Sequence, residues 1–348
     1  LNREVPYFKD RQVMRGEASD PKWSEEEGAL QRTAGGEVYR GSILEHLLIQ
    51  QLAAFYDVGE HNIFRLRGAD WNDALDMAPE RGESVAFTCA YAGNLKDLAG
   101  LLRRLAETWK NVELAEELEE LLRTPPIDYD DLSEKKAVLE RYTRRCAHNV
   151  SGGTIRVLPM ELAENLEGKA DWLMEHIRRQ EWIADGRDGW FNSYYDNHGQ
   201  PLEGIAETGA RMMLTGQVFA IMSGTATEEQ VKAIARSADK YLYKKEEGGY
   251  RLNTDFHELK FDMGRMFGFA YGEKENGAVF SHMTVMYANA LYRRGFVQEG
   301  YKALQTLADA ALDFESSKIY PGIPEYFNAE GRGMYHYLTG AASWYMLT

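Results

Sequence analysis

The chain has only two cysteines, Cys89 and Cys146, among 348 residues. Neither lies in a CxxC pair, so the sequence offers neither a disulfide framework nor a cysteine-rich metal site. Two isolated thiols are typical of proteins that stay in a reducing compartment. We therefore expect a cytoplasmic protein with both thiols reduced.

Long apolar runs and basic clusters are also missing. No stretch approaches about 18 uninterrupted apolar residues, so no membrane span is expected. The net charge is −15, and no Lys/Arg cluster offsets it, so nucleic acid and anionic lipid are not expected partners. The opening segment LNREVPYFKD lacks both a signal-peptide pattern and an initiator Met. We expect the chain to begin part-way through a longer protein.

Several catalytic and cofactor motifs do not occur. The sequence contains no HExxH, EF-hand loop, GxxxxGK[ST] or GxSxG pattern. The eight histidines are scattered without the spacing of metal ligands. We therefore expect no metal, nucleotide or other cofactor.

The chain does contain a repeated helical pattern. Ser42 with Glu45, and Thr227 with Gln230, are spaced as capping boxes ahead of helical segments. Leucines three and four apart predict further helices. We predict about ten helices and no run of alternating strands. Besides the helix that follows Ser42, they cover 95–109, 114–122, 131–147, 161–184, 205–222, 227–243, 281–294, 297–313 and 338–348.

Long connections rich in Gly and aromatic residues separate these helices. They cover 58–83, 185–204, 244–280 and 314–337. Long loops in a compact domain are usually functional or disordered, and the Trp, Tyr, Phe and Asp content argues against disorder. This organisation predicts an all-helical barrel of helix pairs with its loops gathered at one end. We expect residues 1–40 to be an irregular lead-in and residues 41–348 to form one domain.

The most concentrated site signal is RGADWNDALDM, residues 67–77. A Trp71 ring can stack on a pyranose, while Asp70 and Asp73 can bond its hydroxyls or donate a proton. A carboxyl group that protonates a glycosidic oxygen must stay protonated near neutral pH. The same tetrapeptide DWND also fits a loop held by Asx turns around a core Trp. The motif alone leaves both interpretations open.

Two further segments combine polar groups with predicted helix starts. KENGAVFSH offers Lys274, Glu275 and His282, and YLTGAASW offers Thr339 and Gly340. Helix N-termini attract anions through their unpaired N–H groups. An ordinary capped helix with a surface His or Thr is the structural alternative for each segment.

Together, RGADWND, KENGAVFSH and YFNAEGRGMYHYLTGAASWYMLT resemble glycoside hydrolase family 94. The intervening DGRDGWFNSYYDNHGQPLEG fits the same pattern, and the resemblance extends from about residue 40 to the end. This family includes cellobiose, cellodextrin, chitobiose and β-1,2-oligoglucan phosphorylases. The resemblance implies an all-α (α/α)₆ barrel, here incomplete on its N-terminal side.

The resemblance also implies roles for individual residues. Asp73 matches the family's general acid. The phosphate site would use His282, Thr339 and Gly340. Substrate-binding roles fall to Asp70, Trp71, Lys274 and Glu275. The implied reaction is inverting phosphorolysis of β-linked gluco-oligosaccharides to α-glucose 1-phosphate, with inorganic phosphate as co-substrate and no cofactor. The continuation DALDMAPERGESVAFT resembles the β-1,2-oligoglucan enzymes more than the cellobiose enzymes.

Two alternatives remain open at this point. An inverting hydrolase on the same barrel would need a second carboxylate to activate water, for which Glu207 and Glu325 are candidates. A non-catalytic fragment would bind sugar without turnover. Family members carry an upstream β-sandwich, an Arg-Asp sugar motif and a phosphate-binding Arg that have no counterpart in this chain. We therefore expect either an upstream partner chain or a homodimer. This chain alone should bind phosphate weakly and be slow or inactive.

Overall fold

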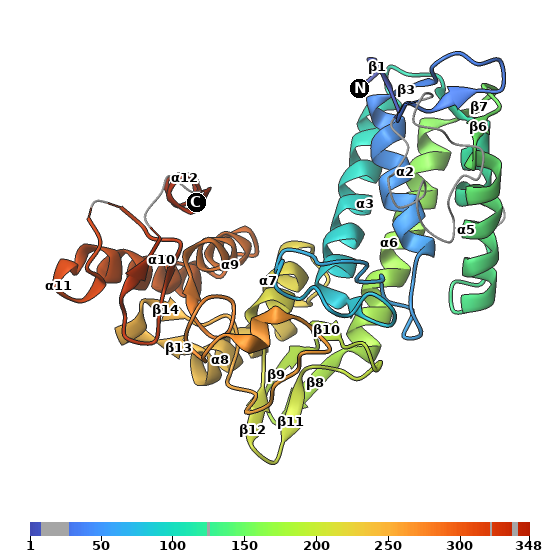
Figure 1. Ribbon diagram of the computed structural model, residues 1–348. Coiled ribbons are helices and arrows are strands. Elements are labelled where there is room, and N and C mark those ends of the chain that lie inside the picture. Colours follow the sequence, from blue (N-terminus) through green and yellow to red (C-terminus); the bar gives the residue numbers. More distant parts are fainter. Residues whose placement is uncertain (8–27, 124–125, 321, 336–339) are drawn as a thin grey trace. The chain divides into compact units, whose positions relative to one another are not determined.

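A computed structural model describes residues 1–7, 28–123, 126–320, 322–335 and 340–348 (Figure 1). These residues form eleven α-helices, α2 to α12, and only short strands. The chain divides into two compact units, Leu1–Val58 with Asn94–Trp172 and Gly59–Gly93 with Leu173–Thr348. The expectation of a largely helical protein is confirmed. The division into a lead-in and a single domain over residues 41–348 stays a prediction.

The first unit is built on long helices. They are α2 (Ile43–Tyr56), α5 (Leu132–Cys146) and the parts of α3 (Val85–Leu105) and α6 (Pro159–Gln180) that fall in this unit (Figure 1). As its spacing predicts, Ser42 caps α2 by accepting a hydrogen bond from the Glu45 amide. Helices α3 and α6 are joined by the ion pair between Lys96 and Asp171, 2.5 Å apart.

Short elements complete the first unit. The antiparallel pairs are β1 (Glu4–Pro6) with β3 (Arg40–Ser42) and β5 (Val112–Ala115) with β7 (Thr154–Val157). A parallel pair joins β2 (Arg32–Thr33) to β6 (Asn149–Val150). The chain continues from β5 into the short helical segments η2 (Glu116–Leu118) and α4 (Glu119–Leu122).

Two lysines are fully buried in the first unit. Lys135 Nζ lies 4.3 Å from the centre of the Phe55 ring, and Lys169 Nζ lies 5.6 Å from the same ring. Lys169 also donates hydrogen bonds to the Leu122 carbonyl and to Asn165 Oδ1. Burial lowers the pKa of each lysine to about 7. The ring faces and carbonyl oxygens partly offset the cost of removing these amines from water.

The second unit contains the remaining helices. They are α7 (Leu214–Met222), α8 (Glu228–Tyr241), α9 (Ser281–Arg293), α10 (Val297–Leu312), α11 (Phe314–Ser317) and α12 (Gly340–Leu347). The predicted capping box at Thr227 and Gln230 is present at the start of α8. Helix α9 packs against α7, α10 and α12. Helix α7 is apolar on every side, and eight of its nine residues are buried, so it lies in the interior of this unit.

Short strands and turns connect these helices. The pairs are β4 (Glu83–Ser84) with β10 (Tyr194–Tyr195), β8 (Trp182–Asp185) with β9 (Asp188–Phe191), β11 (Gly204–Ala206) with β12 (Gly209–Arg211), and β13 (Tyr243–Lys244) with β14 (Gly249–Tyr250). A three-stranded sheet joins β15 (Val279–Phe280), β16 (Tyr326–Phe327) and β17 (Gly333–Met334). This sheet places the start of α9 beside the chain around residue 325, where the Ser281 amide donates to the Glu325 carbonyl at 3.0 Å.

Two predicted helices are partly wrong. The first half of 205–222 forms the β11–β12 hairpin, in which Gly204 and Gly209 adopt positive φ angles that a helix does not allow. The segment 114–122 begins in strand β5, because Leu114 and Ala115 pair with β7. Helical spacing of leucines did not reveal either pairing.

None of the helices in the described part of the chain combines the length and apolar character needed to cross a membrane. Among the same residues, no three His, Cys, Asp or Glu side chains gather as a metal site would require.

Candidate active site

The segment 67–77 belongs to the second unit and is anchored by Asp70. One carboxylate oxygen accepts hydrogen bonds from the Tyr194 hydroxyl and the Asn72 amide, both at 3.0 Å. The other accepts from the Ser84 hydroxyl at 2.7 Å. Burial raises the pKa of Asp70 to about 6, although these donors oppose the rise. Both oxygens are therefore engaged in holding the loop, and substrate contact by Asp70 stays a prediction.

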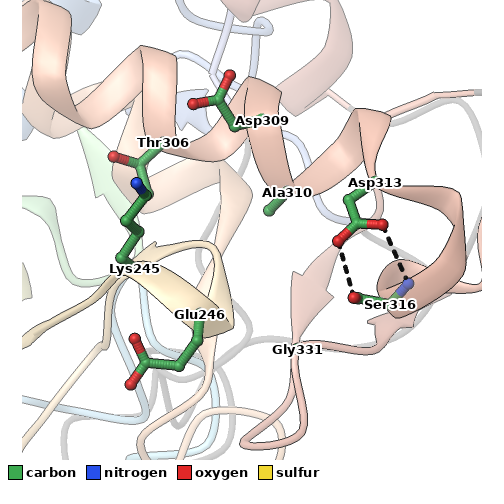
Figure 2. A pocket seen from close by; sticks show the side chains of 8 residues that line it. All are labelled: Lys245, Glu246, Thr306, Asp309, Ala310, Asp313, Ser316 and Gly331. Atoms are coloured by element: carbon green, nitrogen blue, oxygen red, sulfur yellow. Dashed lines mark hydrogen bonds between the residues drawn. The ribbon is translucent and has the colours of Figure 1, made fainter.

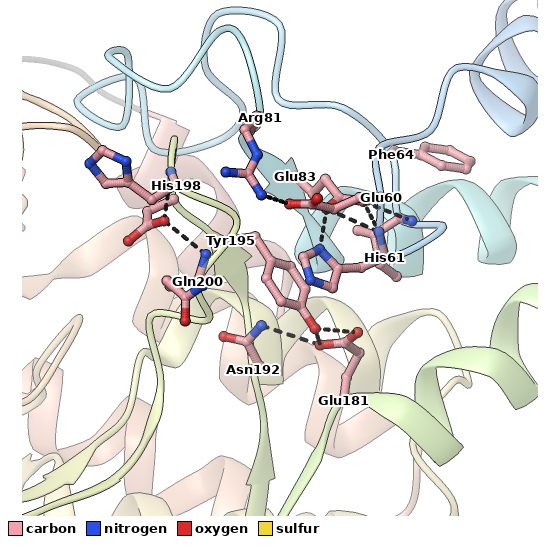
Figure 3. A network of polar contacts seen from close by, with 12 residues as sticks. Glu60, His61, Phe64, Arg81, Glu83, Glu181, Asn192, Tyr195, His198 and Gln200 are labelled. Carbon is pink, nitrogen blue, oxygen red and sulfur yellow. Dashed lines mark hydrogen bonds and ion pairs between the residues drawn. The ribbon is translucent and has the colours of Figure 1, made fainter. Parts of the chain in front are cut away.

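The two hydroxyl donors to Asp70 belong to a two-stranded ladder, whose other residues enter a largely buried polar network. Ser84 pairs with Tyr194, and Glu83 pairs with Tyr195. Because successive strand residues point to opposite sides, Glu83 and Tyr195 point away from Asp70. Figure 3 shows the network that they enter, in which the His61 ring contacts the Glu83 carboxylate at 2.5 Å.

A second buried carboxylate extends this network. The His61 ring stacks on Tyr195 with centroids 3.7 Å apart, and the Tyr195 hydroxyl donates to Glu181 at 3.0 Å (Figure 3). Asn192 Nδ2 also donates to Glu181, at 3.2 Å. Burial raises the pKa of Glu181 to about 7, and the nearby Glu83 raises it further. The network therefore holds the β4–β10 ladder through buried carboxyl groups, of which Glu181 has a pKa of about 7.

Asp73 differs sharply from Asp70 in its surroundings. Its side chain is 78% exposed, and Arg265 Nη2 lies 3.3 Å from its Oδ2 atom. Arg265 Nη1 donates to the Asp73 carbonyl at 2.9 Å and also pairs with the Asp76 carboxylate. The carboxyl group that the sequence predicts as the general acid is thus accessible to a ligand, but it lacks the burial that helps to keep such an acid protonated, and the cation beside it favours the ionised form. Nothing in the sequence motifs pointed to Arg265.

The segment that contains η4 (Arg265–Gly268) and the residues before it also holds the 67–77 loop. The Met77 amide donates to the Met263 carbonyl at 3.1 Å, and the Met266 amide donates to the Ala74 carbonyl at 3.0 Å. A Cβ atom on Gly264 would lie 2.1 Å from the Ala74 carbonyl oxygen. The close approach of the two backbones therefore requires glycine at this position.

The structure brings Trp71 and His282 together. Their ring centroids are 5.6 Å apart, and the His282 ring also contacts Trp344 of α12 at 4.4 Å. His282 Nε2 is buried and has no hydrogen-bond partner among the residues that the structure describes. Desolvation lowers the pKa of His282, which favours its neutral form. An unpaired buried ring nitrogen is costly unless a ligand bonds it.

Lys274 and Glu275 lie in the turn that leads to β15. Lys274 Nζ lies 4.9 Å from the centre of the Phe269 ring. Burial raises the pKa of Glu275, and repulsion from Asp73 contributes to the rise. Asn253 fixes the end of this turn, because its Oδ1 atom accepts from the Gly277 amide at 2.8 Å. Glu275 is therefore within electrostatic reach of the predicted acid.

The third predicted motif is only partly described. Gly340 is the first residue of α12, whereas Thr339 lies outside the described residues. The contact between His282 and Trp344 shows that α12 packs beside the start of α9. Within the described chain, residues from all three motifs therefore belong to the second unit.

A cavity of about 330 Å³ lies elsewhere in the same unit. Figure 2 shows the side chains that line it. Its charged lining consists of Lys245 and three carboxylates, Glu246, Asp309 and Asp313. None of the residues predicted to act on substrate lines it. Its excess of negative charge makes it unsuitable for phosphate.

Comparisons with known proteins identify related phosphorylases. Solabiose phosphorylase of Paenibacillus borealis is 24% identical over 314 residues, which cover 87% of this chain and 34% of that protein. Cellobionic acid phosphorylase of Neurospora crassa is 26% identical over 183 residues, covering 49% and 22%. The 3-O-beta-D-glucopyranosyl-beta-D-glucuronide phosphorylase of P. borealis is 23% identical over 335 residues, covering 92% and 36%. The chain thus spans about a third of these relatives' length or less.

Among solved structures, the mannosylglycerate hydrolase of Thermus thermophilus, a GH63 enzyme in complex with glucose, is similar to 77% of this chain and 46% of its own. The identity is 14% and the TM-score is 0.37, which is too low to establish a shared fold.

A protein-family profile gives the clearest assignment. Residues 159–348 match the catalytic domain of the glycosyl hydrolase 94 superfamily. The match includes Lys274, Glu275, His282 and the last helix, and it begins after the Asp73 loop. Because it covers more than half of the sequence, the chain belongs to the glycosyl hydrolase 94 superfamily.

Proposed function

We propose that this protein is an inverting glycoside phosphorylase that cleaves β-linked gluco-oligosaccharides with inorganic phosphate. The observation that carries the proposal is the contact between Trp71 and His282, with ring centroids 5.6 Å apart. This contact brings the loop of the exposed Asp73 carboxyl next to a buried ring nitrogen without a described partner. An acid and an anion-binding donor on two sides of one sugar subsite are what phosphorolysis requires. The relatives reported above are phosphorylases by name.

The proposed reaction forms one bond at the sugar C1 atom and breaks another. Asp73 donates its proton to the bridging oxygen, which leaves with the shortened glucan. A phosphate oxygen attacks C1 from the opposite face and gives α-glucose 1-phosphate. His282, Thr339 and Gly340 would hold the phosphate, since a neutral imidazole N–H, a hydroxyl and a backbone N–H are hydrogen-bond donors. Trp71 would line the sugar subsite with Asp70, Lys274 and Glu275.

The wider proposal concerns the fold and its partners. The helices would form an (α/α)₆ barrel, with residues 41–348 in the catalytic domain. A cytoplasmic enzyme that uses phosphate as co-substrate, without a cofactor, fits the sequence. A second copy or an upstream partner chain would contribute to the site. An Arg from that partner would neutralise phosphate better than a neutral His282 alone.

A hydrolase is the second candidate. Its catalytic base would be Glu325 rather than Glu207, because Glu325 lies closer to the predicted site. The Glu325 carbonyl accepts from the Ser281 amide at 3.0 Å, next to His282. Glu207, by contrast, is exposed in the turn between β11 and β12. Phosphate is itself a nucleophile, so a phosphorylase needs no second carboxylate as base. Dependence on phosphate therefore separates the two reactions.

The test is incubation with a panel of β-glucobioses, with and without phosphate, while glucose 1-phosphate and glucose are both measured. With the upstream partner chain present, we expect glucose 1-phosphate with at least one linkage and no glucose release without phosphate, whereas the chain alone should be slow or inactive. Asp73→Asn should lower the rate by about 10²–10⁴-fold, the usual contribution of a general acid. Asp309→Asn, another exposed aspartate, is the control. Phosphate-independent glucose release would favour the hydrolase, and sugar binding without any turnover would favour the non-catalytic fragment.

A further inference from the structure

Arg265 holds the Asp73 loop through contacts of two kinds. Its backbone amide donates to Asp76 Oδ1 at 3.2 Å, and its Nη1 atom pairs with the other oxygen of the same carboxylate. Nη1 also donates to the Asp73 carbonyl at 2.9 Å. These contacts fix the guanidinium, because a planar fork with several donors loses little freedom per additional bond.

A second guanidinium nitrogen of Arg265 contacts the Asp73 carboxylate. Nη2 lies 3.3 Å from Asp73 Oδ2. Within the described residues, this is the only ion-pair partner that the structure gives to Asp73, whose side chain is otherwise exposed. A freely rotating carboxyl group would present either oxygen in many directions. An Arg anchored elsewhere limits that rotation and selects one oxygen.

We propose that Arg265 is a positioning residue that holds Asp73 by Oδ2 and leaves Oδ1 to carry the proton to the bridging oxygen. The inference rests on the proposed function of Asp73 as the general acid. In this role Arg265 acts through Asp73 and needs no contact with the sugar or the phosphate. Asp76 takes part indirectly, because it holds Arg265 from the other side.

This role makes a prediction about leaving groups. A sugar hydroxyl leaves only if it receives a proton, whereas 2,4-dinitrophenolate leaves as an anion without one. Loss of positioning should therefore slow cleavage of a natural β-glucoside and spare cleavage of 2,4-dinitrophenyl β-glucoside. A purely structural defect would slow both substrates alike.

The experiment compares Arg265→Ala, Arg265→Lys and Asp76→Asn with the wild-type protein on both substrates at saturating phosphate. The control is Arg236→Ala, because Arg236 forms an ion pair with Asp188 at 2.9 Å and its side-chain exposure, 40%, is close to the 44% of Arg265. We expect Arg265→Ala to lower kcat on the natural glucoside by about 10–100-fold, as a misplaced catalytic group does. Its KM for the glucoside and its rate on the dinitrophenyl substrate should change by less than about threefold.

Arg265→Lys keeps the charge but not the fork, so its kcat should lie between those of the wild type and Arg265→Ala. Asp76→Asn should show the same leaving-group dependence in weaker form. This variant replaces Arg265→Ala as the test if Arg265→Ala fails to fold. Equal losses on both substrates, or no loss on either, overturn the role of Arg265 while leaving the proposed function intact. A wild-type protein that cleaves neither substrate, alone or with the upstream partner chain, overturns the proposed function, and this inference with it.

Discussion

Replacing Tyr194 by Phe removes one of the donors that anchor the Asp73 loop. The Tyr194 hydroxyl donates to Asp70 at 3.0 Å, and the Tyr194 side chain is fully buried. The pKa of Asp70 is about 6, so this carboxyl group is mostly ionised at pH 7.5. A hydrogen bond to a charged group contributes about 1.5–3 kcal/mol, and one to a neutral group about 0.5–1.5 kcal/mol. The Tyr194→Phe substitution should therefore cost more stability at pH 7.5 than at pH 4.5.

The sign follows from linkage. The pKa of Asp70 is raised from 3.8 in the folded state, so its contribution to stability is fully present below about pH 4 and is lost as the pH rises through about 6. Removing a donor to the ionised form raises this pKa further and deepens the loss at high pH. Tyr194→Phe should thus steepen the fall in stability between the two pH values.

The assay is urea unfolding of both proteins at pH 4.5 and pH 7.5. Tyr301→Phe is the control, because the Tyr301 hydroxyl bonds Gln305 on the surface of α10 and its loss should cost less than about 0.5 kcal/mol at either pH. An equal cost of Tyr194→Phe at both pH values would show that the ionised Asp70 does not depend on this bond.

Two further predictions concern His282 and the buried network. His282→Ala should raise the KM for phosphate by about 10–100-fold, because one hydrogen bond to a charged group is lost, and it should raise the KM for glucan much less. Steady-state kinetics measures both values, and an equal rise in the two would count against a phosphate role. In the folded wild type the pKa of Glu181 is raised to about 7, so the contribution of this carboxyl group to stability is lost as the pH rises through 7. The Gln side chain of Glu181→Gln resembles the protonated carboxyl group and does not titrate. The variant should therefore lose about 1–3 kcal/mol less than the wild type between pH 5 and pH 8, and parallel pH profiles of thermal unfolding would refute this.

Local signals in the sequence predicted most of the helices but not the contacts of the site. Ser42 and Thr227 cap their helices as predicted, because a cap depends on residues within one turn. The β11–β12 hairpin was not predicted, because the helix-forming residues of 205–222 outweighed the Gly residues that mark the turn. The DWND motif left two interpretations open, an acid loop and a loop held by Asx turns. The structure shows the turn, and the role of Asp73 as the acid stays a prediction. Asp70 forms the Asx turn, while Asp73 remains exposed.

The supports of the loop could not be read from the sequence. Tyr194 lies 124 residues from Asp70, and Arg265 lies 192 residues from Asp73. No periodicity or motif relates such distant positions, because the contacts depend on how the β4–β10 ladder and η4 pack. The unpaired nitrogen of His282 likewise becomes visible only when its burial against Trp71 and Trp344 is known.

The most direct test of the account is the anomeric form of the sugar phosphate. Proton NMR of a reaction that contains the wild-type protein, inorganic phosphate and a β-linked glucobiose identifies the product as it forms, before it can be altered further. The account predicts α-glucose 1-phosphate from the first turnover, because phosphate attacks C1 opposite to the departing sugar that Asp73 protonates. Formation of β-glucose 1-phosphate, or of glucose with phosphate unconsumed, would contradict it.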